Sequence, residues 1–275
     1  MADTEREEII RDYRENYSKY WAKIFDEIKT EDNCIWLQSP SGYIMKLNGT
    51  VIGMDIPFRA QWVKDLVADR CRKDAECFDY YILSHEHIDH FCPNFLPELS
   101  ESTEMLVPEF FSDEQLALYT HNRKNIQKIQ ANNVYTLGNA DIHTFIGNHF
   151  RPDGNGVNEF GYMFRAGDKK LLFPVDMRDY KKPLPNFGNI DMLFAHVWFC
   201  DDNTKDYSDI LLQQAEFIVR IAPEKVVLAH LDDFERPAHQ RWSKSHAREL
   251  KQKVNELNPD IEVIIPNVGD RIELN

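Results

Sequence analysis

The sequence predicts a protein of the layered α/β (α+β) class, with two β-sheets inside and helices outside. Strand-like segments come in two sets, and helical segments are interleaved with both. The hydrophobic pattern changes from a helical to an alternating period near residue 34, and no linker, low-complexity tract or internal repeat follows. We therefore expect one main domain over residues 34–275, preceded by a helical extension over residues 1–33.

Composition narrows the classes of function. The chain has 275 residues, enough for a large core, and its formal net charge is −14. An acidic surface repels polyanions, and no Lys and Arg cluster interleaved with aromatic residues is present, so nucleic acid is not an expected partner. The acidic N-terminus and the lack of a long apolar run predict a cytoplasmic protein that spans no membrane. Five cysteines without a close Cys-x-x-Cys pair argue against a disulfide framework and a thiolate zinc site.

The first expected element is an amphipathic helix over residues 4–30. Its apolar and aromatic residues recur at steps of three and four: Ile10, Tyr13, Tyr17, Tyr20 or Trp21, Ile24 and Ile28. We expect this stripe to pack on the body of the protein or on a second subunit, so a homo-oligomer is one expectation.

The first set of strands follows this helix. Alternating apolar and polar residues predict strands over residues 34–38, 43–47, 50–55, 78–83, 105–107 and 134–136. Asn48-Gly49 predicts a tight hairpin between the second and third of them. Residues 59–70 have a helical period, and Ser112 with Gln115 predicts the start of another helix.

The densest group of metal-ligating residues is the loop Ser84-His85-Glu86-His87-Ile88-Asp89-His90, directly after an apolar run. Imidazoles with a carboxylate suit zinc and its first-row neighbours. No single ion can use all four ligands comfortably from so short a segment, so the spacing predicts two ions side by side. The alternative is a polar surface loop or one adventitious metal site, because motif matches carry a false-positive risk.

The second half repeats one pattern, an apolar strand that leads to a His or an Asp. Residues 142–146 lead to His149, residues 171–175 to Asp176, and residues 226–229 to His230. An isolated His after a strand is usually a surface or hydrogen-bonded residue. Two ions need more ligands than the loop offers, so three such strand ends become ligand candidates. Helices over 208–222 and 243–257 and a last strand over 261–265 complete the chain.

The His-x-His-x-Asp-His loop with these three later residues resembles the metallo-β-lactamase superfamily, from about residue 34 to the end. The resemblance implies a four-layer αββα sandwich with two divalent metal ions at one edge of the sheets, zinc expected and manganese or iron as alternatives. It places His85, His87 and His149 on the first ion, and Asp89, His90 and His230 on the second, with Asp176 bridging. His143 lies on the same strand as His149 and competes with it; we prefer His149 because it stands where the strand enters a loop.

The resemblance also narrows the subgroup. The glyoxalase II and lactonase type carries His-Thr-Pro-Gly where this chain has Asn148-His149-Phe150-Arg151, and flavodiiron proteins carry Glu where His87 stands. The layout around Gly161-Tyr162 and Val268-Gly269-Asp270 is similar to ascorbate-6-phosphate lactonase and tRNase Z-like hydrolases.

The expected activity is hydrolysis of a small anionic ester, lactone or phosphodiester by a hydroxide held between the ions. Asp89 would orient that hydroxide. His196 follows an apolar run in the same way as the ligands, which places it near the leaving group; its alternative is a backbone-bonded histidine. Arg178 would bind a phosphate or carboxylate, with an exposed salt bridge as the alternative. Two other functions stay open, an iron-dependent redox or oxygenase protein and an RNA-processing nuclease of the tRNase Z type.

Overall fold

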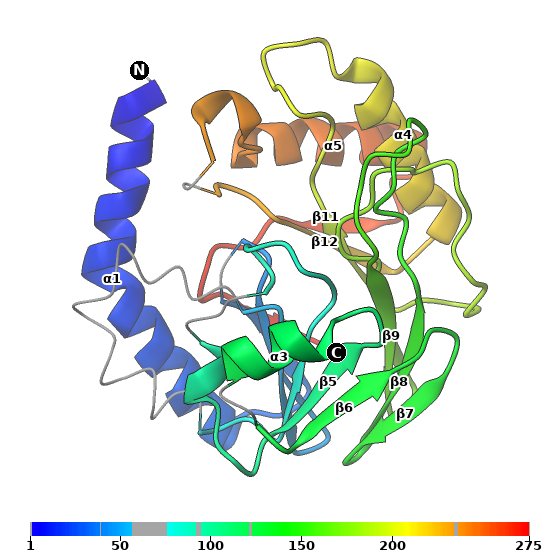
Figure 1. The fold of residues 1–275 in the computed structure, drawn as a ribbon. Coiled ribbons are helices and arrows are strands. Elements are labelled where there is room, and N and C mark those ends of the chain that lie inside the picture. Colours follow the sequence, from blue (N-terminus) through cyan, green and yellow to red (C-terminus); the bar gives the residue numbers. More distant parts are fainter. Residues whose placement is uncertain are drawn as a thin grey trace.

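Two β-sheets packed face to face form the centre of the molecule (Figure 1). The structure is a computed structural model that describes residues 2–38, 40–56, 76–91, 95–120, 123–233 and 236–274. Within these residues, fourteen strands form two seven-stranded sheets, and helices cover both outer faces. The predicted αββα sandwich is confirmed.

The first sheet has the strand order β14-β1-β2-β3-β4-β5-β6. Its strands are β1 (Cys34–Leu37), β2 (Tyr43–Leu47), β3 (Thr50–Met54), β4 (Tyr80–Ile82), β5 (Glu104–Pro108), β6 (Ile126–Ile129) and β14 (Arg271–Glu273). The predicted hairpin joins β2 to β3, and its two residues Asn48 and Gly49 both have positive φ, as a tight two-residue turn requires. Strands β3 to β6 run parallel to one another.

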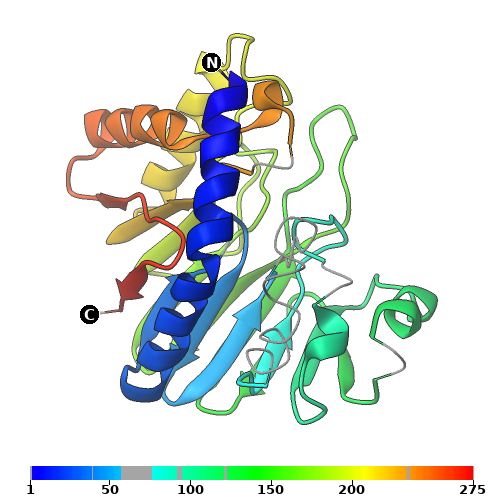
Figure 2. The ribbon, with the colours of Figure 1, turned by 90° about the vertical axis from the view of Figure 1, so that its left-hand side faces the viewer.

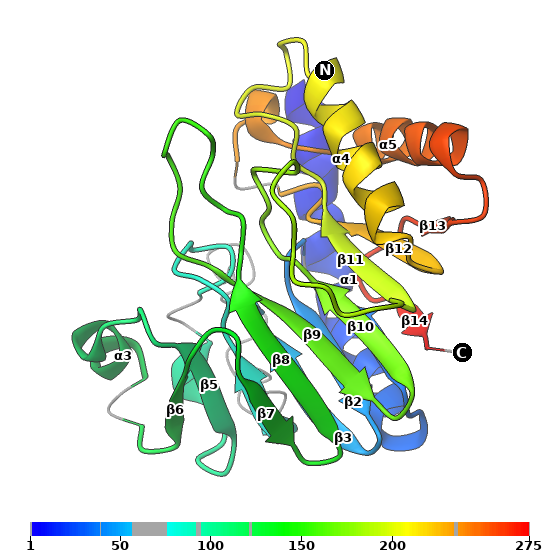
Figure 3. The ribbon, with the colours of Figure 1, turned by 90° about the vertical axis from the view of Figure 1, so that its right-hand side faces the viewer.

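The second sheet has the order β13-β12-β11-β10-β9-β8-β7. Its strands are β7 (Val134–Leu137), β8 (Ala140–Ile146), β9 (Phe160–Ala166), β10 (Lys169–Phe173), β11 (Met192–His196), β12 (Lys225–Ala229) and β13 (Glu262–Ile264). Strands β10 to β13 are parallel, and β8 points the same way because β9 lies antiparallel to both β8 and β10. Figure 3 shows β7 to β11 side by side in this sheet.

The helices are α1 (Ala2–Thr30), α3 (Asp113–Thr120), α4 (Ser208–Ile221) and α5 (Lys244–Leu257), with 3-10 turns η1 (Leu96–Glu98) and η2 (Ala238–Gln240). The predicted start of α3 is confirmed, since Ser112 and Gln115 exchange side-chain to backbone hydrogen bonds of 3.1 Å in both directions. No helix in the described ranges is long and apolar enough to cross a membrane.

Three apolar layers hold the sandwich together. Trp21, Ile24 and Ile28 of α1 are buried on the outer face of the first sheet, along which the helix lies in Figure 2. The middle layer fills the space between the sheets, and the third lies between the second sheet and the helices α4 and α5. The C-terminal half of the predicted stripe on α1 therefore packs on the body of the protein.

Several local expectations differ from the structure or lie outside it. The predicted helix over 59–70 lies outside the described residues. Strands β6 and β14 were not predicted, because each is only three or four residues long and has charged or amide side chains among its apolar ones. The division of the chain at residues 33 and 34 stays a prediction.

Candidate metal centre

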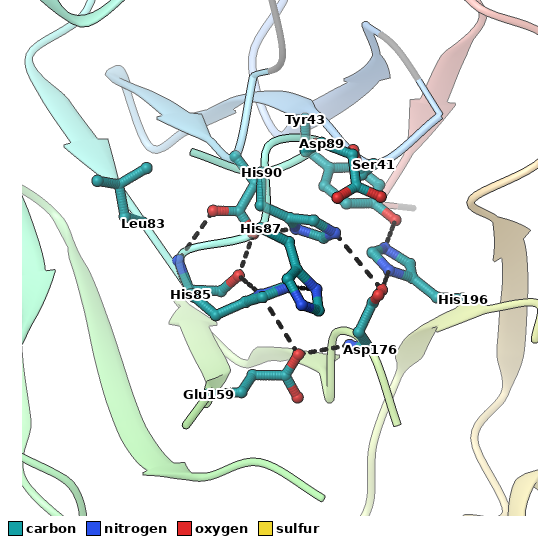
Figure 4. A network of polar contacts seen from close by, with 12 residues as sticks. Ser41, Tyr43, Leu83, His85, His87, Asp89, His90, Glu159, Asp176 and His196 are labelled. Carbon is teal, nitrogen blue, oxygen red and sulfur yellow. Dashed lines mark hydrogen bonds and ion pairs between the residues drawn. The ribbon is translucent and has the colours of Figure 1, made fainter. Parts of the chain in front are cut away.

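The topology brings the predicted ligands to one edge of the sandwich. Strands β8, β10, β11 and β12 are parallel, so their carboxyl ends meet at the same edge of the second sheet. His149, Asp176, His196 and His230 stand at or just beyond these four ends. The loop of residues 84–90 follows β4 of the first sheet and reaches the same place, as Figure 4 shows for its side chains.

A first group of donors consists of His85, His87, His149 and Asp176. One ligand atom from each lies within 4.8 Å of the other three. His85 Nε2 and His87 Nδ1 are 3.1 Å apart, and the ring of His149 lies 4.8 Å from that of His87. His149 Nε2 is buried and has no hydrogen-bond partner among the described residues. Such an orphaned nitrogen, on a ring close to two other imidazoles, fits a metal ligand.

A second group consists of His90, Asp176, His196 and His230, all buried, again with one atom of each within 4.8 Å of the others. Asp176 Oδ1 lies 3.5 Å from His90 Nε2 and 3.8 Å from His230 Nε2. Asp176 thus belongs to both groups.

Asp89 lies beside the second group without belonging to it. Its Oδ2 is 3.2 Å from His230 Nε2 and accepts a hydrogen bond of 3.0 Å from Arg236 Nη2. Arg236 also donates to Asp233 through Nε, at 3.0 Å. The structure therefore brings all seven predicted ligands together. It also places Arg236, which was not predicted, on Asp89.

Two buried carboxylates support the ligands from behind, and the sequence analysis did not assign either to the site. Asp55 Oδ2 lies 2.9 Å from His90 Nδ1, and its Oδ1 accepts the Ser84 N–H at 2.8 Å. Glu159 Oε2 accepts the Asp176 N–H at 2.9 Å and lies 3.5 Å from His85 Nδ1. A carboxylate on the far nitrogen orients a metal-binding imidazole and makes it more basic. Asp55 also follows an apolar strand, which was the available signal; Glu159 had none.

His196 is engaged on both sides. Its Nδ1 lies 2.7 Å from Asp176 Oδ1, and its Nε2 lies 2.9 Å from the hydroxyl of Tyr43. Since a neutral imidazole has one donor and one acceptor, Nδ1–H donates to the carboxylate and the tyrosine hydroxyl donates to Nε2. Figure 4 shows this chain from Tyr43 through His196 to Asp176.

Burial sets the charge of the first group. It lowers the pKa of His85 and of His87, and it lowers the pKa of His149 to about 3. These imidazoles are therefore neutral at pH 7, which is the form that binds a metal ion.

The second group is governed by its carboxylates. Burial acts to lower the pKa of His90, but the charges of Asp176 and Asp55 outweigh it and raise that pKa well above its usual value. Burial acts to raise the pKa of Asp89, but His230 and His90 outweigh it and lower that pKa. His90 is thus paired with the charges of Asp176 and Asp55.

Two further predicted residues are placed as follows. Arg178 is buried, donates from Nη2 to Asp176 Oδ2 at 2.9 Å and lies over the ring of Trp198. The alternative prediction for Arg178, an exposed salt bridge, is therefore wrong. His143 is half-buried in β8, with its ring 6.1 Å from that of Phe187, and belongs to neither donor group.

An αββα sandwich with imidazoles and carboxylates gathered at one sheet edge defines a class of metal-binding proteins. Residues 50–231 match the family model of the beta-lactamase superfamily domain, and the chain belongs to that family. The resemblance to the metallo-β-lactamase superfamily is thereby confirmed. A comparison with curated proteins found no match.

Solved structures share the fold at low sequence identity. A possible metal-dependent hydrolase from Veillonella parvula DSM 2008 is 14% identical, with a TM-score of 0.64 over 88% of this chain and 98% of that one. The metallo-beta-lactamase fold protein YhfI from Bacillus subtilis is 17% identical, with a TM-score of 0.59 over 87% and 99%. CmlA, a diiron beta-hydroxylase from Streptomyces venezuelae, is 14% identical, with a TM-score of 0.62 over 88% of this chain. The chain spans only 54% of CmlA.

Proposed function

We propose that the protein is a binuclear metal-dependent hydrolase that acts on a small anionic ester, lactone or phosphodiester. The observation that carries this proposal is the shared position of Asp176, whose carboxylate belongs to both donor groups. Two dications bound side by side supply a hydroxide nucleophile near neutral pH and polarise the scissile carbonyl or phosphoryl group.

The residues divide between the two ions as the family resemblance implies. His85, His87 and His149 are proposed to hold the first ion. Asp89, His90 and His230 are proposed to hold the second, and Asp176 to bridge them. The nitrogen-rich donor set fits zinc, with manganese or iron as alternatives.

Side chains of the protein are proposed to orient the nucleophile and to position the leaving group. Asp89, held by Arg236, is proposed to orient the nucleophile. His196 is proposed to lie near the leaving group, where the sequence analysis put it. Both of its nitrogens are hydrogen-bonded, which favours a positioning role through Asp176 over direct proton donation. The leaving group then takes its proton from water.

Metal content tests the proposal, and the chain offers a matched control. His149 and His143 are six positions apart, but only His149 lies in a donor group. We expect the native protein and His143→Ala to carry two ions per chain, and His149→Ala to lose the first ion. His87→Ala should fold while its activity on a panel of lactones, phosphodiesters and thioesters falls by orders of magnitude. Equal metal content in the two alanine variants at 143 and 149 would contradict the ligand assignment.

An iron-dependent oxygenase is the second candidate, since CmlA is described as a diiron beta-hydroxylase. Histidine and carboxylate donors also suit iron. Protein purified without added metal separates the two: a colourless protein with zinc or manganese supports hydrolysis, and iron with a visible absorption band supports oxygenase chemistry.

The third candidate is an RNA-processing nuclease of the tRNase Z type. A net charge of −14 disfavours it, because binding to the phosphate backbone depends on Lys and Arg. We expect no binding of tRNA at low salt. The partners we propose are a small-molecule substrate and a second copy of the chain.

A further inference from the structure

Arg178 has hydrogen-bonding capacity that the protein does not use. The residue is 8% exposed, yet its Nη1 has no hydrogen-bond partner among the described residues. Its Nη2 donates to Asp176, so the guanidinium lies at the metal centre. A buried donor without a partner is costly unless a ligand completes it.

The ring of Trp198 holds this guanidinium in place. The guanidinium carbon of Arg178 lies 4.3 Å from the ring centroid, within the range of a cation–π contact. Arg151 lies over the same ring at 5.1 Å, but it makes a two-fold ion pair with Asp201, at 2.5 and 2.6 Å. Of the two arginines on Trp198, Arg151 thus uses both Nη atoms on one carboxylate, whereas Arg178 uses Nη2 on Asp176 and keeps Nη1 without a partner among the described residues.

Arg178 meets Asp176 on the carboxylate oxygen that makes none of the contacts with the second group. Oδ1 of Asp176 faces His90, His196 and His230 of the second group, whereas Oδ2 faces Arg178. The backbone N–H of Arg178 donates to the backbone carbonyl of Asn148 at 2.8 Å. This hydrogen bond ties Arg178 to the segment that carries His149.

We propose that Arg178, stacked on Trp198, is a subsite for a second, non-reacting anionic group of the substrate, a carboxylate or a phosphate. The substrate class is then an ester, lactone or phosphodiester that carries a fixed oxyanion apart from its scissile bond. This rests on the proposed hydrolase function. A planar guanidinium matches such an oxyanion in geometry, and its partial burial strengthens the attraction relative to water.

Matched substrates test the subsite. The para-nitrophenyl monoester of glutaric acid carries a carboxylate, and para-nitrophenyl butyrate does not; both report through the same leaving group. We expect the native enzyme to prefer the anionic ester in kcat/KM. In Arg178→Gln that preference should fall at least tenfold, mainly through a higher KM for the anionic ester. Arg178→Lys should keep part of it, because the charge remains while the fork is lost. Arg165→Gln, which removes an exposed pair with Asp141, is the control and should keep the full preference.

A binding measurement separates failure of the subsite from failure of the hydrolase proposal. Glutarate should change the fluorescence of the metal-loaded native protein through Trp198, and neutral glutaramide should not. The response should vanish in Arg178→Gln and in Trp198→Phe. Glutarate binding without ester hydrolysis would support the subsite and count against the hydrolase. Hydrolysis with an equal loss of both esters in Arg178→Gln would overturn the subsite and leave Arg178 as a support for Asp176.

Discussion

The two donor groups at the metal centre differ in the protonation of their imidazoles. The imidazoles of the first group are neutral because they are buried, and His149 Nε2 has no partner in the described part of the chain. The second contains His90, whose pKa Asp176 and Asp55 raise well above its usual value, and beside this group Asp89 is paired with Arg236. An ion that binds the first group meets three neutral imidazoles, whereas one that binds the second must also displace the proton that Asp176 and Asp55 hold on His90. We therefore expect the first ion to bind more tightly than the second.

The largest expected effect comes from the residue that the two groups share. Asp176→Asn keeps the size of the side chain and removes its charge. We expect metal content to fall at both positions and turnover to fall by orders of magnitude, because neither ion keeps its bridging carboxylate. Elemental analysis with single-turnover kinetics checks this. Loss of only one ion would show that the groups do not share Asp176.

The supporting carboxylates separate the two groups. Asp55→Asn removes the carboxyl group that lies beside His90 Nδ1, and Glu159→Gln removes the one that lies beside His85 Nδ1. Loss of such a partner weakens metal binding by about 10- to 100-fold. In a zinc titration of the metal-free protein, Asp55→Asn should weaken the second step alone, and Glu159→Gln should weaken the first. If both variants weakened the same step, the division into two groups would be wrong.

Tyr43→Phe should have a smaller effect, confined to the second group. It removes the hydroxyl that lies 2.9 Å from His196 Nε2 and leaves a buried nitrogen unpaired. Such a loss costs about 1–3 kcal/mol of stability. Denaturant unfolding gives the stability, and kcat should fall only a few-fold because Asp176 keeps its contact with His196. A fall as large as that of Asp176→Asn would instead give Tyr43 a direct part in the reaction.

The prediction with the least bearing on turnover is a pH dependence of the stability of the metal-free protein. His149 has its pKa lowered to about 3 when folded, against its usual 6.5, so the unfolded chain binds a proton first as the pH falls. The free energy of unfolding should therefore decrease below about pH 6.5. His149→Asn removes this term, and its curve should be shallower by about 1.4 kcal/mol per pH unit between those pKa values. Parallel curves for the two proteins would show that His149 is not buried as a neutral ring.

Local patterns were enough to predict the layers, the hairpin at Asn48-Gly49 and the helix start at Ser112. Each depends on residues close together in the chain, where period and turn chemistry act directly. The short strands β6 and β14 were missed, because pairing with a neighbouring strand determines them and their own residues do not.

The same contrast holds at the site. The amino-acid sequence by itself determined which residue types stand at the strand ends, and hence that the chain carries the donors for a metal centre. Tertiary structure alone decided what lies behind and beside those donors: Tyr43 on His196, 153 positions away, and Arg236 on Asp89, 147 positions away. Ligand chemistry belongs to each side chain and can be recognised along the chain. A hydrogen-bond partner depends on which strands become neighbours and in which register, and that follows only from packing the whole sandwich.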